Sequence, residues 1–295
     1  MKRRHFIRDV TAGGLLLGMH PDLFAQSGGP PDLAVVKGES PSLITREAVK
    51  ILGGMGRFIN KGEKVMIKPN IGWDRKPEQG ACTNPDVVKA LVEMCLEAGA
   101  GKVTVMDNPC NPARRTYVRS GIARAAKDAG AKVPFPNKHK LKKTPLGGKT
   151  LKEWEVFSDF LEVDKIINVP AAKHHSLSRV TLGMKNWLGA LGGNRNALHQ
   201  GLDSAVVDLA AFFKPALTVL DAYRILHRNG PQGGRASDVK LNQTVVAGVD
   251  FAAVDAFGAT YFDIPPSELR FLQLARERGL GEIDLEKVKI EKRTI

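Results

Sequence analysis

The chain has 295 residues and a formal net charge of +13. With 43% hydrophobic and 25% charged residues, its composition is that of a globular protein and excludes global disorder. A basic surface attracts nucleic acid, anionic lipid or small anions. Only 6% of the residues are aromatic and no nucleic-acid-binding motif is present, so we expect no nucleic-acid partner.

Residues 1–25 have the layout of a signal peptide, with a basic start, a short apolar middle and a small residue at Ala25. Arg3 and Arg4, followed by His5-Phe6-Ile7, resemble a twin-arginine (Tat) signal. An ordinary secretory signal and an uncleaved anchor are the alternatives. We expect export to the periplasm through the twin-arginine machinery, no membrane span after cleavage, and a fold that carries a metal or cofactor.

The remaining residues, 26–295, alternate between strand and helix patterns and are interpreted as one domain, with a small subdomain at 136–160 as an option. Predicted strands cover 33–38, 63–71, 102–109, 132–135, 153–157, 163–170, 216–226, 239–250 and 288–290. Predicted helices cover 44–59, 84–100, 113–131, 204–213, 251–262 and 266–281, with Asn84 as an N-cap. This order predicts an α/β fold, a largely parallel sheet with helices on both faces in three layers.

Polar residues close five of the predicted strands. They are Lys68 and Asn70, Asp107 and Asn108, Lys173 to His175, Asp221 and Arg224, and Asp250. The carboxyl ends of parallel strands meet at one edge, where open α/β sheets bind ligands, so these clusters could converge on one site. The plainer alternative is that strands end in Asp or Asn because turns use them, and that Asp250 caps the following helix.

The adjacent histidines His174 and His175 suggest acid–base or metal chemistry. They cannot both face one ligand from a regular strand, because side chains alternate along it. Together with His199 and a carboxylate, a histidine could bind Zn, Fe, Ni or Mn. We therefore take His174, His199, Asp221 and Asp250 as candidate ligands of a transition metal. The three cysteines, Cys82, Cys95 and Cys110, are too widely spaced for an iron–sulfur cluster motif.

Several cations could hold a small anion. Lys68, Lys173, Lys185 and Arg235 are the candidates, and the glycines of Gly230–Arg235 could bring backbone N–H groups to a carboxylate or phosphate. The alternative is a plain flexible loop. This segment lacks the motifs of ATP or NAD sites.

Seven segments of the chain resemble the DUF362 family. They are IKPN at 67–70, TNPDVV at 83–88, EAGA at 97–100, residues 167–189, residues 208–222, GPQGG at 230–234 and AGVDFAAVDAF at 247–257. The resemblance covers roughly residues 60–281. Lys185 and Asn186 match the family's KN pair, and Asp250 and Asp255 match its two aspartates. The family's single histidine after a lysine has two counterparts here, His174 and His175.

The family is named for unknown function, so the resemblance implies little about activity. Some members carry an attached iron–sulfur domain, whose cysteines this chain lacks. The central segment is also similar to the histidine–glycine–lysine region of nickel-pincer lactate racemases. That similarity implies proton or hydride movement next to a carboxylate, with histidine as the base and lysine as the anchor.

We therefore expect an exported enzyme that acts on a small anionic substrate, assisted by a metal or cofactor that the sequence does not identify. His174, His175 and Lys185 are the expected catalytic residues. The expected substrate-binding residues are Lys68, Asn70, Lys173, Asn186, Gly233 and Arg235. The alternatives are a non-catalytic periplasmic protein that binds an anion or a metal, and an assembly partner that uses the basic run 138–152.

Overall fold

The structure is a computed structural model that describes residues 29–295. Within this range the chain forms a mostly parallel mixed sheet of nine strands, in the order β11-β1-β10-β9-β6-β2-β3, with β7 and β8 attached beside β9. Its strands are β1 (Leu33–Lys37), β2 (Lys64–Pro69), β3 (Lys102–Val105), β6 (Lys165–Val169), β7 (Ala171–His175), β8 (Arg179–Thr181), β9 (Leu217–Leu226), β10 (Val239–Gly248) and β11 (Ile290–Thr294). A separate antiparallel pair, β4 (Leu141–Pro145) and β5 (Glu153–Phe157), occupies much of residues 136–160.

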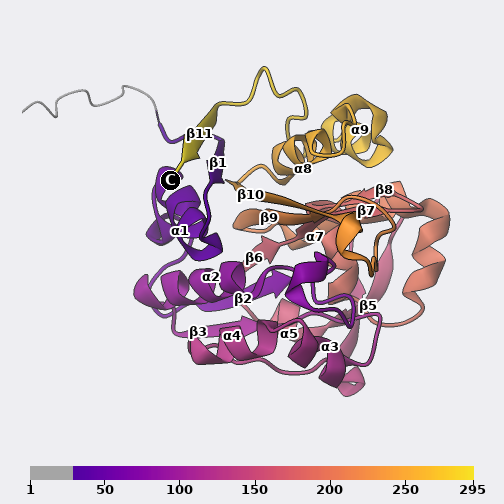
Figure 1. The fold of residues 1–295 in the computed structure, drawn as a ribbon. Helices are drawn as coiled ribbons and strands as arrows, with labels where there is room; N and C mark the ends of the chain where they lie inside the picture. The colour runs from indigo at the N-terminus through magenta and orange to yellow at the C-terminus, as the bar shows by residue number, and fades with distance from the viewer. Residues whose placement is uncertain (1–28) are drawn as a thin grey trace, which may run out of the picture.

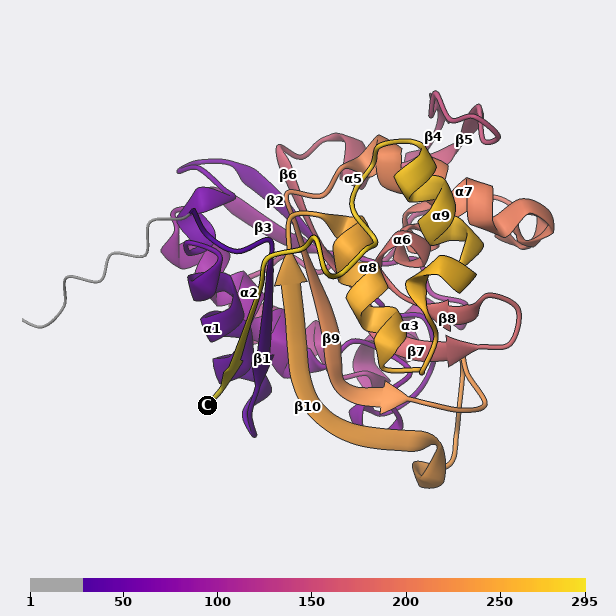
Figure 2. The same cartoon turned by 90° about the horizontal axis from the view of Figure 1, so that it is seen from above.

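Helices cover both faces of the sheet, as the sequence predicts. The α-helices are α1 (Pro41–Ile51), α2 (Pro85–Glu97), α3 (Ala113–Arg119), α4 (Ile122–Asp128), α5 (Ser158–Leu161), α6 (Gly183–Asn186), α7 (Leu202–Phe213), α8 (Phe251–Thr260) and α9 (Arg270–Glu277). Figures 1 and 2 show α1 and α2 on one side of the sheet and α7, α8 and α9 on the other. The result is a three-layer α/β fold.

The side chains of β1 explain the layers. Leu33 and Val35 belong to the apolar core beneath α7, α8 and α9, whereas Ala34 and Val36 belong to the core beneath α1 and α2. Because successive side chains of a strand point to opposite faces, a strand buried on both faces must be apolar throughout. The continuous apolar runs of the sequence therefore correspond to strands covered on both sides.

Most predicted elements form within a few residues of their predicted bounds, and Asn84 caps α2 by accepting from the N–H of Asp86 at 2.9 Å. Three predictions are wrong. The helix expected at 44–59 ends at Ile51, because Gly53 and Gly54 have φ +100° and +81°, and only a short 3₁₀ turn follows at Met55–Arg57. The helix expected at 113–131 is two helices, because Gly121 between them has φ +75°. The strand expected at 132–135 is a single bridge from Lys132 to Thr104.

The direction of β10 is the correction that matters for the site. β10 runs antiparallel to both β9 and β1. Its carboxyl end therefore lies at the opposite edge of the sheet from the carboxyl ends of β2, β3 and β6. Asp250, which follows β10, is consequently not brought to the edge where the other polar strand ends meet.

The basic run 138–152 lies on and around the β4–β5 pair. Three of its lysines face carboxylates: Lys140 pairs with Asp159, Lys142 with Glu162 and Lys143 with Glu153. Much of the positive charge of this run is therefore balanced locally. Within residues 29–295, no helix has the length and apolar character needed to cross a membrane.

Candidate functional site

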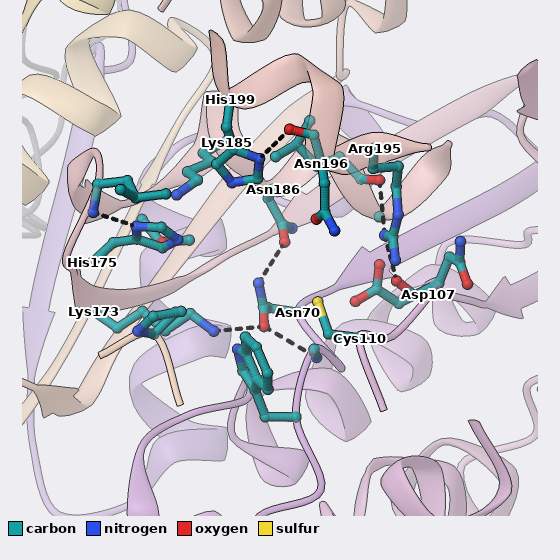
Figure 3. A pocket seen from close by; sticks show the side chains of 18 of the residues that line it. Asn70, Asp107, Cys110, Lys173, His175, Lys185, Asn186, Arg195, Asn196 and His199 are labelled. Atoms are coloured by element: carbon teal, nitrogen blue, oxygen red, sulfur yellow. Dashed lines mark hydrogen bonds between the residues drawn. The ribbon is translucent and has the colours of Figure 1, made fainter. Parts of the chain in front are cut away.

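A cavity of about 330 Å³ lies at the carboxyl edge of β2, β3 and β6, beneath the β7–β8 hairpin. Six of the residues expected from sequence line it: Asn70, Lys173, His175, Lys185, Asn186 and His199. Figure 3 shows Lys173, His175 and Lys185 toward one end of the cavity and Arg195 toward the other, with Asn70 and Asn186 between them. The parallel strand ends therefore bring together residues that are far apart in sequence.

The β7–β8 hairpin decides which of the two histidines faces the cavity. Lys173 and His175 are two residues apart on β7, so their side chains share one face, and both are buried with 1% and 8% exposure. His174 points the other way, where its Nδ1 accepts from the N–H of Gly230 at 3.2 Å. The structure thus gives His175 a place in the cavity and His174 a place against the 229–231 loop.

Five polar side chains form a network at the bottom of the cavity, which we call the floor: Lys68, Asp107, Lys173 and Asn186, which are buried, and Asn70, which is half-buried. Lys68 donates to Asp107 at 2.6 Å, to the carbonyl of Pro69 at 2.8 Å and to Asn186 at 3.2 Å. Asn70 donates to the same Asn186 oxygen and accepts from Lys173 at 2.9 Å. Every member is therefore held by at least one other.

Lys68 was expected to bind substrate, but the structure does not bring it into the cavity. It is fully buried, and its three ammonium hydrogens already have three acceptors. Burial lowers the pKa of Lys68, and the adjacent Asp107 carboxylate opposes that effect. Lys68 thus holds Asp107 and Asn186 in place from below. Gly189 allows this packing, because a Cβ there would lie 1.8 Å from Asp107 Oδ1.

Lys185 and Asn186 lie on α6, a single helical turn that a buried carboxylate fixes from behind. Asp255 on α8 accepts from the N–H of Gly183 at 2.6 Å and from the N–H of Met184 at 2.8 Å. Asn186 in turn donates to Asn168 at the end of β6 at 2.9 Å. The turn that carries Lys185 is therefore attached to two separate elements of the core.

The rim of the cavity, by which we mean His175, Lys185, Arg195 and His199, is less constrained. Lys185 donates to Ser178 Oγ at 2.6 Å. The guanidinium of Arg195 donates to three backbone carbonyls, of Asn108, Pro109 and Leu188. Within residues 29–295, neither Lys185 nor Arg195 forms an ion pair with a carboxylate.

Hydrogen bonds fix the proton positions of the two histidines. His175 Nδ1 accepts from the N–H of Leu177 at 3.1 Å, so the neutral ring carries its proton on Nε2. His199 Nδ1 lies 3.2 Å from the carbonyl oxygen of Asn196, which only accepts, so its neutral ring keeps a free lone pair on Nε2. The rings are stacked with centroids 6.3 Å apart. The cavity thus has one imidazole donor beside one imidazole acceptor.

Burial among cations shifts the pKa values of the cavity. Desolvation, followed by the charges of Lys185 and Lys173, lowers the pKa of His175 to about 3. Desolvation lowers the pKa of Lys173 to about 8, and desolvation with the charge of Lys173 lowers that of Lys185 to about 7. His175 is therefore neutral at pH 7, and a substantial fraction of Lys185 is a free amine. An anion in the cavity would favour the charged forms of the lysines.

The four candidate metal ligands are not assembled. His174 faces Gly230, and His199 lines the cavity. Asp221 is buried and accepts from the N–H of Asn84 at 2.6 Å and of Tyr223 at 3.0 Å. Asp250 caps α8 by accepting from the N–H of Ala252 at 2.8 Å. In the part of the chain that the structure describes, no group of three or more His, Cys, Asp or Glu side chains is arranged to bind a metal ion.

The glycine-rich loop after β9 also lies differently from expectation. Gly233 and Arg235 do not line the cavity, and from this loop only Pro231 reaches it among the described residues. The N–H of Gly233 donates to the carbonyl of Asn229 at 3.0 Å, which closes a turn and leaves that group unavailable to an anion. Arg235 is exposed.

Several lining residues had no expected role, among them Trp73, Cys110, Thr181, Arg195 and Asn196. Thr181 lies directly across from Lys173 in the β7–β8 register, and its buried Oγ finds no hydrogen-bond partner among the described residues. Arg195 and Asn196 sit in the glycine-rich segment after α6, where only its proximity to Lys185 in sequence could have pointed to them. Asp107 was recognised as a strand end, without a role.

Comparisons with known proteins identify the family. Residues 65–260 match DUF362, a domain of unknown function. A thylakoid-associated protein of Synechocystis is 27% identical over 260 residues, which cover 82% of this chain and 77% of that protein.

Two solved structures show a likeness at 12% sequence identity. The lactate racemase apoprotein of Thermoanaerobacterium thermosaccharolyticum gives a TM-score of 0.48 over 77% of this chain, and a Thermotoga maritima protein gives 0.38 over 81%. The chain spans 56% and 60% of the lengths of those two chains. Because the family match covers well over half of its length, the chain belongs to the DUF362 family.

Proposed function

We propose that this protein is an enzyme that binds a small carboxylate or phosphate in the cavity and moves a proton on it. The observation that carries this proposal is a cavity whose cations outnumber its carboxylates. Lys173, Lys185 and Arg195 line it, and Asp107, its lining carboxylate, is already paired with Lys68. An anion supplies the charge that these groups lack.

The histidine pair supports proton transfer rather than binding alone. His199 Nε2 can accept a proton, while His175 Nε2 can donate a hydrogen bond to an oxygen on which negative charge develops. His174 or His175 was expected to be the general base, but His174 faces away from the cavity and the acceptor nitrogen of His175 is occupied by the backbone. The structure favours His199 for that role, and His175 for polarising the substrate.

Hydrogen–deuterium exchange tests the proposal. The purified protein is incubated in D₂O with lactate, pyruvate or phosphate, and binding is measured by calorimetry. Exchange of the hydrogen on C2 of lactate or on C3 of pyruvate is followed by NMR. We expect binding of at least one carboxylate and exchange that His199→Gln abolishes and that the outward-facing His174→Gln retains. A His199→Gln protein that exchanges as fast as the wild type would contradict the assignment of the base.

The second candidate is a protein that binds an anion without transforming it. The floor favours it, since a network with all members held is a rigid receptor. Tight binding of a carboxylate with no exchange in either the wild type or His199→Gln would select this candidate over the enzyme.

We also propose that the protein is exported by the twin-arginine route. The proposal rests on the sequence of residues 1–25, which lie outside the described residues. The relative from Synechocystis is named for association with thylakoids, a membrane system, and this is consistent with targeting of related chains. Replacement of Arg3 and Arg4 by lysine should retain the protein in the cytoplasm, whereas unchanged export would indicate another route.

A further inference from the structure

Lys185 has a hydrogen-bonding arrangement unlike that of the other cavity lysine. Its Nζ donates to Ser178 Oγ at 2.6 Å, and that hydroxyl donates its own hydrogen to the carbonyl of Val180 at 2.8 Å. Ser178 therefore acts only as an acceptor toward Lys185. When Lys185 is neutral, one N–H is used by Ser178, and the nitrogen lone pair has no donor to bind among the described residues.

Lys173 is the natural comparison. Its Nζ has two oxygen acceptors, Asn70 Oδ1 at 2.9 Å and the carbonyl of Ala81 at 2.7 Å, and its side chain is 1% exposed. These acceptors favour the ammonium form and hold it in one position. Lys173 is thus built to remain a fixed cation, and its charge in turn favours the neutral amine of Lys185.

The backbone that carries Lys185 is held in place by the core of the protein. α6 is attached to Asp255 through two backbone N–H groups and to Asn168 through Asn186. A nucleophile held by the core loses little conformational freedom when it reacts. Desolvation lowers the pKa of Lys185 to about 7, so the reactive form is present at neutral pH.

The groups around Lys185 match a carbonyl compound that also carries a carboxylate. The Nε2–H of His175 can donate to a carbonyl oxygen, because the Nδ1 of the neutral ring is the nitrogen that accepts from the backbone. Lys173 and Arg195 are cations for a carboxylate. The Oγ of Thr181 is buried at the cavity wall without a partner and can donate to the same carboxylate.

We infer that Lys185 is a nucleophile that forms an imine with a 2-oxo acid, an inference that rests on the proposed function and specifies its substrate class. The Lys185 amine adds to the carbonyl carbon: a C–N bond forms, the π bond of the carbonyl breaks, and a proton of the amine passes to the oxygen through water to give a neutral carbinolamine. A second proton, from solvent, then lets the hydroxyl leave as water, and the nitrogen lone pair forms the C=N bond of the protonated imine. The imine draws electrons from the neighbouring carbon, so a proton leaves that carbon more readily, and His199 Nε2 is the acceptor present in the cavity.

Reductive trapping tests the imine directly. The protein is incubated with pyruvate or 2-oxoglutarate, treated with borohydride and digested, and its peptides are analysed by mass spectrometry. Reduction of the imine attaches the whole acid less one oxygen atom to the lysine. We expect this increase in mass on the peptide that contains Lys185, with none after incubation with lactate, which has no carbonyl group.

Two charge-preserving variants serve as matched controls. Lys185→Arg keeps the cation but has no amine that forms an imine, so trapping should be lost while calorimetric binding of pyruvate persists. Lys143→Arg, at an exposed lysine of β4 outside the cavity, keeps Lys185 and should still be trapped. Trapping at another lysine, or trapping that survives in Lys185→Arg, overturns the inference.

Calorimetry separates the two ways of failing. Pyruvate or 2-oxoglutarate that binds the wild type without being trapped overturns the imine and leaves the proposed anion site standing. If neither 2-oxo acid binds, while lactate or phosphate does, the substrate class is wrong. If none of these anions binds, the proposed function fails together with the inference.

Discussion

The floor and the rim of the cavity use the same kinds of side chain in opposite ways. In the floor, Lys68 is fully buried and each of its three ammonium hydrogens has an oxygen acceptor, whereas the buried Lys173 has two acceptors and keeps one hydrogen for a ligand. In the rim, Lys185 has one hydroxyl acceptor and His199 one backbone carbonyl. A cation whose hydrogens are all used stabilises the architecture of a site, whereas a cation or imidazole with a free position is available to a ligand. Counting the hydrogen-bonding positions that a side chain has left unused therefore distinguishes residues that support the site from residues that can contact a ligand. Residue type alone does this less well.

The largest expected effect is a loss of folding stability when the ion pair of the floor is broken. Asp107→Asn leaves the fully buried Lys68 ammonium without its carboxylate, so we expect the free energy of unfolding to fall by about 3–5 kcal/mol. Chemical denaturation measures the change. Glu153→Gln removes one carboxylate from the exposed pair with Lys143 and should cost about 0–1 kcal/mol. A similar small cost for both variants would show that the floor pair does not stabilise the fold.

The double variant Lys68→Met/Asp107→Leu sharpens the same comparison. It removes both charges, so no buried ion is left unpaired, and we expect it to recover much of the stability that Asp107→Asn loses. A double variant no more stable than Asp107→Asn would mean that the shape of the network, rather than its charge balance, is what the fold requires.

The second largest expected effect concerns His175 in the rim, and it is a change in how the free energy of unfolding depends on pH. The pKa of His175 is about 3 in the folded protein, below the ordinary value of 6.5. Between these values the unfolded chain binds a proton that the folded chain does not, so the free energy of unfolding falls as the pH falls from about 6.5 toward 3. One such group contributes at most about 1.4 kcal/mol per pH unit.

Denaturation curves at several pH values measure this slope. His175→Gln should lose the part of the slope that His175 contributes, while His139→Gln, an exposed histidine outside the cavity, should retain it. If wild type and His175→Gln lose stability in parallel as the pH is lowered, His175 is not the buried neutral group described here.

The smallest effect is expected at Thr181, which is buried like the floor but unpartnered like the rim. Thr181→Val removes a hydroxyl that makes no bond in the free protein, so the free energy of unfolding should stay the same or rise by about 1 kcal/mol. Pyruvate binding should weaken by about 10-fold or more, because a hydrogen bond to a charged carboxylate contributes about 1.5 kcal/mol or more. Calorimetry and denaturation together check both parts.

Thr144→Val is the matched control for Thr181→Val, since the Thr144 hydroxyl donates to the carbonyl of Lys142 on β4, away from the cavity. It should leave ligand affinity unchanged. A Thr181→Val protein that binds pyruvate as tightly as the wild type would show that this hydroxyl does not face the ligand.

The sequence predicts the parts of the site that depend on local rules. Strand alternation separates His174 from His175, and the meeting of parallel strand ends brings Asn70 near Lys173. The position of Asp250 shows what was missed. Two parallel strands that are adjacent in a sheet need a long connection, usually a helix. The sequence between β9 and β10 predicts only a glycine-rich loop. That loop indicates a hairpin, and hence an antiparallel β10.

The rest depends on three-dimensional contacts that no local pattern contains. Nothing near Lys68 in sequence shows that Asp107, 39 residues away, will neutralise it. Arg195 reaches the cavity because its guanidinium binds carbonyls at the end of β3, which only the folded chain places beside it. A polar residue at the end of a predicted strand therefore indicates where its side chain will lie. It does not indicate whether another side chain will neutralise its charge.

The short turn between β7 and β8 has a consequence for redesign. Ser176 and Leu177 line the cavity from this turn, and the Leu177 side chain is 71% exposed, so it contributes little to the core. The hairpin is joined to the large sheet through β7, and the turn lies beyond the last residue of that strand. We expect that exchanging the side chain at 177 alters the size of the accepted molecule, whereas adding residues there would also displace the Leu177 N–H that binds His175. The side chain at 177 can therefore be exchanged to change ligand selectivity without altering the strands and helices that keep the protein folded.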